Sequence, residues 1–512
     1  MPRNGADTLA RTLADLGVDT CFANPGTTEM HLLAALGREQ RMTLHLCLFE
    51  GVATGAADGY GRMKGRPAVS LLHLGPGLAN GMANLHNARK AATPVLTLVG
   101  EHASYHSQFG SPLTADIEGM ARTVSDWVAT PRSAGELAGL TAQMVAAAQG
   151  AGRVATLIVP NDTAWDEDDT PAPVCEVAEP EMPTSTDIDA AAAVLKPGAA
   201  MLVGSPFVTA RMAALATAIG ATTGCTVLTE AAVARMARGR GVAPLTRIPF
   251  HVDFATEALK SLHTAVLVGA GDPVAFFAYP DRPSRMLPPD CRVLPLAVPL
   301  ADIEAVLERL ADAVGAVPAP VAARVLPPVP EAGPITPRTL AAAVATALPE
   351  GAIVVDESIT SGVHLFGLCA DAAPHDWINN RGGSIGYSMP VSVGCAAACP
   401  DRPVLCLTGD GSAMYTLQAL WTMARAQMNV TVVVLANRRY NILANETSKI
   451  GAGEPANATM PMLSLDDPAP DWVRLAEGQG VSAERCADAL QLSEALRRAL
   501  GSAGPHLIEA VL

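Results

Sequence analysis

The chain has 512 residues, of which 49% are hydrophobic, and a formal net charge of -15. This length predicts about three domains with sizeable apolar cores. The acidic balance and the lack of a basic stripe exclude a typical nucleic-acid binder, because binding to nucleic acid depends on Lys and Arg side chains that neutralise phosphates.

The cysteines and the N-terminus indicate a cellular compartment. The ten cysteines are scattered through apolar segments, without paired metal-type spacing or a short disulfide framework, so we expect reduced thiols. The N-terminus lacks an apolar signal core, and no uncharged apolar run reaches the ~18–20 residues that span a bilayer. We therefore expect a cytoplasmic protein without a membrane partner.

Two segments interrupt the alternation of apolar runs and helical patterns. Residues 166–183 are rich in Pro, Asp and Glu, and residues 317–337 are rich in Pro and Ala. Both compositions are typical of linkers. The predicted domains are therefore 1–165, 184–316 and 337–512.

In each domain, short β-rich apolar runs are followed by a turn residue and an Ala/Leu-rich helical segment, which is typical of βαβ units. Parallel strands that are buried on both faces are expected to be this continuously apolar. The sequence therefore predicts an α/β fold with three doubly wound parallel-sheet domains. The predicted strands are 44–49, 68–74, 94–99, 200–203, 226–228, 264–268, 292–297, 352–355, 404–408 and 430–436.

Polar side chains stand at the ends of four predicted strands. Glu50 and His73 lie at strand ends in the first domain, and Asp410 and Asn437 follow strands in the third domain. In open α/β sheets, ligands bind outside the carboxyl ends of the strands. We therefore look for the chemistry of this chain at these four positions.

The segment from Gly409 to Ser412 joins a buried strand to a helix expected to begin near Ala413. Its glycines let the backbone approach a ligand, and a helix N-terminus favours an anion such as a diphosphate. A hard cation such as Mg2+ would bridge the diphosphate, with Asp410 as one oxygen ligand and the turn at Asn437 as the source of a second. Taken alone, the segment is equally compatible with a turn and a helix cap.

The spacing of these two turns resembles the cofactor motif of the thiamin diphosphate-dependent enzymes of 2-oxo acid metabolism. The resemblance implies that Mg2+ is held by the side chains of Asp410 and Asn437 and by the backbone oxygen of Arg439. It also implies that Gly411 and Ser412 contact thiamin diphosphate. The family usually has two consecutive asparagines, whereas this chain has an alanine before Asn437.

Glu50 taken alone is compatible with a carboxylate that stabilises the positive end of a helix. However, Phe49-Glu50 followed by Asp58-Gly59-Tyr60 and Arg62 resembles the segment that holds the catalytic glutamate of this family. The resemblance implies that Glu50 hydrogen-bonds the pyrimidine of the cofactor and activates its thiazolium carbon.

Two further segments of the third domain match the family. Gly383 and Ile385 correspond to the carbonyl that accepts from the pyrimidine and to the apolar wedge beneath the cofactor. Ser358 and Thr360 follow a buried strand and are candidates to donate hydroxyls to the diphosphate. A helix N-cap is the alternative for Ser358 or Thr360.

The type of reaction depends on residues of the pocket. The segment around Thr27 resembles the benzoylformate decarboxylase loop that places a hydroxyl over the substrate carboxylate, and His73 matches a proton-relay histidine of those enzymes. Both residues favour decarboxylation of a 2-oxo acid to an aldehyde. Against this, the position expected for a second histidine is Ala278, which leaves His102, His106 and Tyr279 as possible substitutes.

Two alternatives remain open from the sequence. An acetolactate synthase-type carboligase shares the glycine pair of Gly75 and Gly77 and the domain order, although the chain is short and shows no obvious FAD signature. A nucleotide-binding or regulatory protein is the other, but the third glycine of the dinucleotide fingerprint is missing. The family resemblance also implies a homodimer or homotetramer with active sites at the subunit interface.

Overall fold

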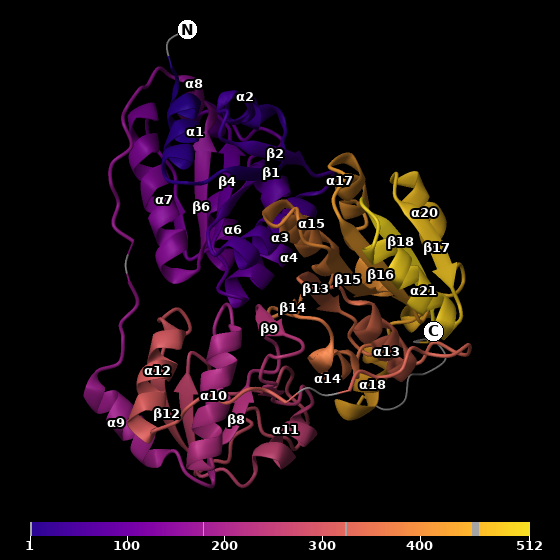
Figure 1. The fold of residues 1–512 in the computed structure, drawn as a ribbon. Coiled ribbons are helices and arrows are strands. Elements are labelled where there is room, and N and C mark those ends of the chain that lie inside the picture. The colour runs from indigo at the N-terminus through magenta and orange to yellow at the C-terminus, as the bar shows by residue number, and fades with distance from the viewer. Residues whose placement is uncertain (1–2, 178, 323–324, 453–459) are drawn as a thin grey trace.

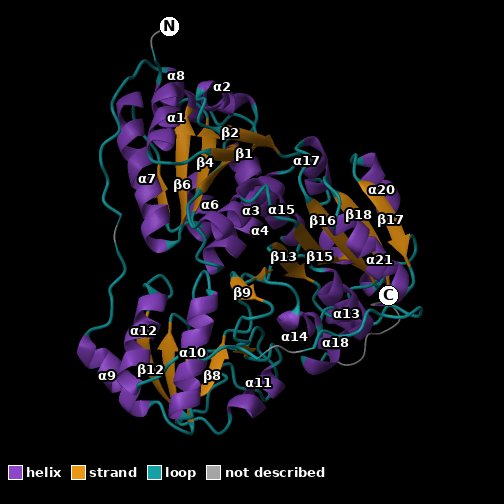
Figure 2. Cartoon of the chain, in the orientation of Figure 1, coloured by secondary structure: helices purple, strands orange, loops and turns teal. Residues whose placement is uncertain are grey.

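The computed structural model describes residues 3–177, 179–322, 325–452 and 460–512. Three α/β sheets, each made mainly of parallel strands, form the molecule, and helices cover their faces (Figures 1 and 2). The predicted fold class is therefore confirmed.

The first sheet lies at the N-terminal end of the chain and has the strand order β2-β1-β3-β4-β6-β5, with all pairs parallel. Its strands are β1 (Thr20–Asn24), β2 (Thr43–Leu46), β3 (Ala68–His73), β4 (Val95–Glu101), β5 (Trp127–Ala129) and β6 (Val154–Pro160). The helices of this part are α1 (Gly5–Asp15), η1 (Thr27–Glu29), α2 (Met30–Arg38), α3 (Glu50–Lys64), α4 (Leu74–Lys90), α5 (Ser104–Ser107), α6 (Ile117–Val124), η2 (Ala134–Glu136), α7 (Leu137–Ala151) and α8 (Asn161–Trp165).

The second sheet has the order β10-β8-β7-β11-β12, again with parallel pairs. Its strands are β7 (Ala199–Val203), β8 (Thr226–Thr229), β10 (Thr246–Arg247), β11 (Thr264–Val268) and β12 (Arg292–Ala297). The helices are α9 (Ser185–Val194), α10 (Ala210–Thr223), α11 (Val252–Leu259) and α12 (Ile303–Val314).

The third sheet has the order β17-β18-β16-β15-β13-β14-β9. Its strands are β9 (Met236–Arg238), β13 (Ala352–Glu357), β14 (His375–Asn379), β15 (Val404–Gly409), β16 (Val430–Ala436), β17 (Ser482–Cys486) and β18 (His506–Val511). The helices are α13 (Pro337–Ala347), α14 (Leu365–Leu368), η3 (Cys369–Asp371), α15 (Ser388–Ala398), α16 (Asp410–Ala413), α17 (Ala419–Arg425), α18 (Asn441–Lys449), α19 (Met460–Leu463), α20 (Trp472–Gly478) and α21 (Ala489–Leu500).

One strand of the third sheet comes from the middle of the chain. The short strand β9 pairs antiparallel with β14, so the third sheet is not wholly parallel as the sequence predicted. Arg235, just before β9, also forms an ion pair with Asp376 of β14 at 3.2 Å. The pairing of β9 with β14 and this ion pair attach the central part of the chain to the edge of the third sheet.

The structure adds strands that were not predicted, namely β1, β5, β6, β9, β10, β14, β17 and β18, and two expectations next to the candidate site differ from it. The predicted strand 44–49 is shorter, because β2 ends at Leu46 and Phe49 already caps α3. The helix expected near Ala413 begins three residues earlier, at Asp410. The active-site candidates Glu50 and Asp410 are therefore each the first residue of a helix rather than part of a longer loop.

Helices α3 and α15 pack closely and join the first and third parts of the chain. A Cβ added at Gly59 would lie 2.1 Å from the Val391 carbonyl oxygen, and one added at Gly394 would lie 1.9 Å from the Ala56 carbonyl oxygen. On the same helix α3, the Arg62 guanidinium pairs with the Asp58 carboxylate at 2.7 Å. Arg62 also donates to the backbone oxygen of Asn379 at 2.7 Å, which fixes α3 against β14.

The cysteines of the described chain are free, and eight of the ten are buried. Burial raises the pKa of the Cys406 and Cys369 thiols to about 12, which disfavours thiolates there. No helix within the described ranges is long and apolar enough to cross a membrane.

Candidate active site

The predicted metal edge lies where β15 and β16 end side by side. The Asp410 carboxylate accepts from the backbone N–H of Gly411 at 2.9 Å and from that of Arg438 at 2.6 Å. The Asn437 side-chain oxygen accepts from the Arg439 N–H at 3.1 Å. Asp410 is 3% exposed, and burial raises its pKa above the ordinary aspartate value. The structure thus brings the three predicted metal ligands together from two neighbouring turns at one edge of the third sheet.

The turn that contains Gly411 and Ser412 leaves its backbone open to a ligand. A Cβ added at Gly411 would lie 2.4 Å from Tyr440 Cε1, so only glycine leaves the backbone open there. Ser412 is buried beside it. In the described ranges, no group of three or more His, Cys, Asp or Glu side chains could hold a metal ion. A carboxylate, an amide oxygen and a backbone oxygen form the kind of oxygen set that suits Mg2+.

The hydroxyl candidates after β13 differ in their surroundings. The Ser358 hydroxyl donates to Asp356 Oδ1 at 2.5 Å, and its backbone N–H donates to the same oxygen at 3.0 Å. Thr360 is half-buried. The N-cap alternative for both residues is wrong, because the helix that follows, α14, begins at Leu365.

Gly383 and Ile385 lie in the loop between β14 and α15. Gly383 has a φ of 81° and a Cβ there would lie 2.2 Å from Phe276 Cζ, so the glycine is required by both conformation and space. The Asn87 amide on α4 donates to the Ser384 oxygen at 2.9 Å and accepts from the Ser384 N–H at 3.1 Å. This pair holds the loop against the first part of the chain, with Ile385 half-buried.

Glu50 is 8% exposed at the start of α3. Its Oε2 accepts from the Asn80 side-chain amide at 3.1 Å. A Cβ built on Gly77 would lie 3.4 Å from both Glu50 Oε1 and His73 Cβ, so Glu50 and His73 flank this glycine of α4. The two first-domain candidates are therefore neighbours.

His73 is held by a buried carboxylate that the sequence analysis missed. Glu29 is fully buried, and its Oε2 lies 2.8 Å from His73 Nδ1. The Thr28 hydroxyl lies 3.2 Å from the same ring nitrogen and also donates to Glu29. Thr27 is exposed at the start of η1. The signal for Glu29 was its position at the end of a strand-turn segment, but its partner is 44 residues away.

The backbone gives a separate indication of the site. Six non-glycine residues of the described chain have positive φ, and three of them adjoin predicted site residues. These are Leu74 (52°), Ile359 (43°) and Arg438 (57°), next to His73, Ser358 and Asn437 respectively. Such conformations cost free energy in side chains other than glycine and cluster at functional sites.

The central segment carries no histidine at the expected position. Ala278 is exposed, and the neighbouring Tyr279 hydroxyl donates to Glu446 of α18 at 2.8 Å. His102 is hydrogen-bonded to Ser111 at 2.9 Å, and His106 is exposed. Three aromatic side chains near these residues, Phe109, Phe276 and Phe277, are 74%, 48% and 49% exposed.

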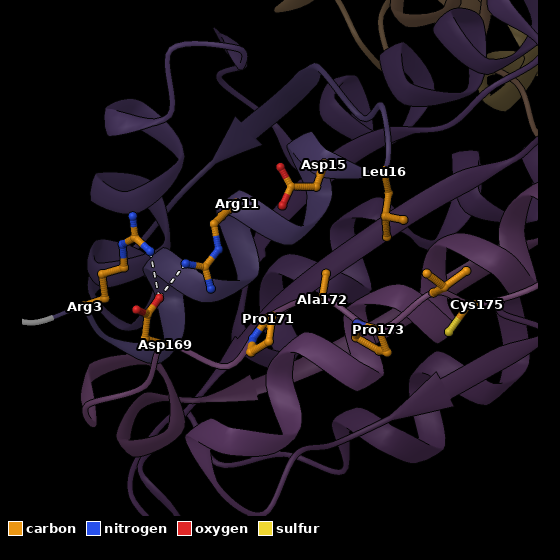
Figure 3. Close-up of a pocket in the computed structure, with 10 residues that line it drawn as sticks. Arg3, Arg11, Asp15, Leu16, Asp169, Pro171, Ala172, Pro173 and Cys175 are labelled. Carbon is orange, nitrogen blue, oxygen red and sulfur yellow. Dashed lines mark hydrogen bonds and ion pairs between the residues drawn. The ribbon is translucent and has the colours of Figure 1, made fainter.

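A surface hollow lies elsewhere, between α1 and the chain that follows α8 (Figure 3). Asp169 there pairs with Arg3 at 2.8 Å and with Arg11 at 2.5 Å. These ion pairs are largely exposed, so they contribute little to stability. None of the predicted site residues lines this hollow.

Three helix-flanked, mainly parallel sheets make up the molecule, and the candidate side chains lie at the carboxyl ends of strands in the first and third sheets. Residues 3–122 match the N-terminal TPP binding domain of the thiamine pyrophosphate enzymes, and residues 362–510 match the C-terminal TPP binding domain. The chain belongs to this thiamine pyrophosphate enzyme family.

Individual relatives agree with this assignment. The chain is 44% identical to the "Putative acetolactate synthase large subunit IlvX" of Mycobacterium tuberculosis, over 99% of both chains. It is 28% identical to benzoylformate decarboxylase of Pseudomonas aeruginosa, over 96% of both chains. The thiamine diphosphate-dependent 4-hydroxybenzoylformate decarboxylase of Rhodococcus jostii RHA1 shares the fold, with a TM-score of 0.84, 24% identity and coverage of 99% of this chain and 98% of that one.

Proposed function

We propose that the protein decarboxylates a 2-oxo acid to an aldehyde with thiamin diphosphate and Mg2+. The observation that carries the proposal is the His73–Glu29 pair beside Glu50. An aldehyde-forming decarboxylase needs a proton carrier at the reacting carbon, and a histidine positioned by a carboxylate is suited to that task.

The residues of the third sheet would hold the cofactor. Asp410, Asn437 and the Arg439 backbone oxygen would bind Mg2+. Gly411, Ser412, Ser358 and Thr360 would contact the diphosphate, and the Gly383 oxygen and the Ile385 side chain would contact the rings. When bound, the cofactor supplies a carbon nucleophile and an electron sink for the electrons left by CO2.

The first-sheet residues would handle protons and the substrate. Glu50, partly shielded from water and fixed by Asn80, would exchange a proton with the pyrimidine ring. His73, with Nδ1 directed to Glu29, would present Nε2 as the exchanging nitrogen. Thr27, whose side chain is exposed at the start of η1, would donate its hydroxyl to the substrate carboxylate.

Product identification tests this function. The purified protein, saturated with thiamin diphosphate and Mg2+, is incubated with pyruvate, branched-chain 2-oxo acids and benzoylformate, each with and without an acceptor aldehyde. We expect CO2 and a free aldehyde from at least one substrate in the absence of acceptor. No CO2 from any of these 2-oxo acids would contradict the proposal.

A carboligase of the acetolactate synthase type is the second candidate. The 44% identity to the relative named as such favours it, and so does Ala278 in place of a second histidine. Acetohydroxy acid from pyruvate, without free acetaldehyde, would establish the carboligase and exclude the decarboxylase.

We further propose a cytoplasmic homodimer or homotetramer whose active sites combine the first sheet of one subunit with the third sheet of another. Two apolar side chains just before Glu50 support this, because Leu46 and Leu48 are 37% and 45% exposed in the single chain. Light scattering coupled to size-exclusion chromatography measures the assembly. A monomer that is fully active would contradict it.

A further inference from the structure

A buried carboxylate not used in the proposed chemistry lies at the end of β13. Glu357 is 5% exposed, and its Oε1 accepts from the backbone N–H of Gly386 at 2.8 Å and of Tyr387 at 3.4 Å. Its Oε2 accepts from the Ser388 N–H at 3.2 Å, from the Ser388 hydroxyl at 2.7 Å and from the Thr408 hydroxyl at 3.5 Å. Three backbone and two side-chain donors thus converge on one side chain.

The donors belong to separate segments of the third sheet. Gly386, with a φ of 83°, closes the loop that holds Gly383 and Ile385. Thr408 lies on β15, two residues before Asp410. Glu357 itself directly precedes Ser358. One carboxylate therefore connects the three segments that are proposed to contact the rings, the metal ion and the diphosphate.

Stability alone is a poor explanation for a carboxylate at this place. Within the described ranges, Glu357 forms no ion pair that would compensate the loss of hydration, and burial raises its pKa to about 6. A buried charge without a paired cation is costly, and a neutral or apolar side chain of similar volume often serves stability as well or better. An acceptor of five donors, however, specifies one arrangement of the segments around it.

We propose that Glu357 is a positioning residue that fixes the ring-contacting loop, the diphosphate turn and the metal strand in the arrangement that binds the cofactor. This inference rests on the proposed cofactor site. Because the Gly386 and Ser388 donors flank Tyr387, whose hydroxyl donates to the Asp356 oxygen at 2.7 Å, the loop is fixed at both its backbone and its side chain. Loss of the carboxylate would remove the acceptor shared by Gly386, Tyr387 and Ser388, while the Asn87 and Thr416 contacts of the loop would remain.

The test compares Glu357→Gln with Asp488→Asn. Asp488 is a matched control because it also accepts three backbone N–H groups, from Gly333, Leu490 and Gln491, at 2.5, 2.9 and 3.2 Å, and caps α21. Each purified apo-protein is titrated calorimetrically with thiamin diphosphate in excess Mg2+, and its thermal unfolding is followed separately.

We expect Glu357→Gln to weaken cofactor binding by about 10–100-fold, the usual effect of removing an outer partner of a ligand site. Asp488→Asn is expected to lower the melting temperature while its cofactor Kd stays within about twofold of the wild type, since it touches no cofactor segment. An unchanged Kd in Glu357→Gln, or equal losses of affinity in both variants, would overturn the inference.

Ser388→Ala provides a milder variant if Glu357→Gln does not fold. It removes the hydroxyl donor at 2.7 Å and keeps the carboxylate and its backbone donors. We expect its cofactor Kd to rise about fivefold, as for the loss of about 1 kcal/mol from one ordinary hydrogen bond, and a Kd equal to the wild type contradicts the role of Glu357. Wild-type protein that binds the cofactor but turns over no 2-oxo acid would contradict the proposed function alone.

Discussion

The carboxylates at the edges of the first and third sheets differ in their side-chain partners: an imidazole and an amide lie beside those of the first sheet, whereas backbone N–H groups and hydroxyls surround those of the third. At the first sheet, Glu50 accepts from the Asn80 amide, and Glu29 contacts the His73 ring, the Thr28 hydroxyl and one backbone N–H, that of Gly26. At the third sheet, in the part of the chain that the structure describes, Asp410 accepts from two backbone N–H groups and Glu357 from three, together with two hydroxyls.

This difference bears on what each edge can do. A backbone N–H does not titrate, so a carboxylate surrounded by such groups is a fixed acceptor that holds geometry. A carboxylate beside an imidazole lies next to a group that can exchange a proton, and a side-chain amide, although it does not titrate, can reorient. We infer that the third-sheet edge holds the cofactor and that the first-sheet edge moves protons.

Replacement of Glu50 by Gln is the strongest test of the edge of the first sheet, which is proposed to transfer protons. The amide keeps the shape but has no exchangeable acid, so we expect kcat to fall by about 10²–10⁴-fold, the range for loss of a general acid–base group. Steady-state kinetics measures the effect, with exposed Glu118→Gln on α6 as control. Unchanged rates in Glu50→Gln would remove the residue from the mechanism.

Asp410→Ala tests the edge of the third sheet, which is proposed to hold the cofactor. It removes the only charged ligand proposed for Mg2+, so we expect Mg2+-dependent cofactor binding to weaken by more than about 100-fold, beyond the loss caused by an outer partner. Calorimetry with and without Mg2+ measures this. Wild-type affinity in the variant contradicts the metal assignment.

His73→Ala separates proton relay from a structural histidine. We expect aldehyde release to slow by about 100-fold while the cofactor Kd is unchanged. Exposed His31, which packs edge-on against Trp165, gives a matched His→Ala control. If His73→Ala and His31→Ala have the same rate of aldehyde release, the His73–Glu29 pair is structural.

The pH dependence of stability sharpens the account of Glu357. Its folded pKa of about 6 lies above the ordinary value of 4.5, so the folded protein binds the proton more tightly than the unfolded chain. The associated stability is present below pH 4.5 and is lost as pH rises through 6, by up to about 2 kcal/mol. Urea unfolding of wild type and Glu357→Gln between pH 4 and 7 measures the difference. Parallel curves for the two proteins would contradict this assignment.

Thr27→Val should have the smallest effect. Loss of one exposed hydroxyl that contacts substrate is expected to raise KM about fivefold with little change in kcat. Steady-state kinetics over a range of 2-oxo acid concentrations measures the two constants. A large fall in kcat with unchanged KM would place Thr27 in the chemical step instead.

The sequence predicted the fold class because it depends on local patterns, and the same patterns indicated where to look for a site. Continuous apolar runs marked ten of the strands, and Asp410 and Asn437 stood after two of them, but the buried strands β1, β6, β14 and β18 were not predicted. The pairing of β9 with the third sheet could not be predicted, because a three-residue antiparallel strand has no distinctive sequence pattern.

The parts of the candidate site that the sequence did not predict depend on contacts between residues far apart in the chain. Glu29 meets His73 across 44 residues, and the donors of Glu357 come from 29 to 51 residues away. Positive φ at Leu74, Ile359 and Arg438 is likewise imposed by tertiary packing, because the residue types themselves disfavour it. A single sequence contains no local signal for such contacts.

The central claim is that the third-sheet edge holds the cofactor and the first-sheet edge transfers protons. It is tested most directly by the cofactor Kd of the double variant Glu50→Gln/His73→Ala, measured by calorimetry in Mg2+. Both changes lie at the first-sheet edge and keep every proposed third-sheet contact. A Kd within about threefold of the wild type is predicted, because less than 1 kcal/mol of binding free energy is then lost. A loss as large as that of Asp410→Ala would contradict the claim.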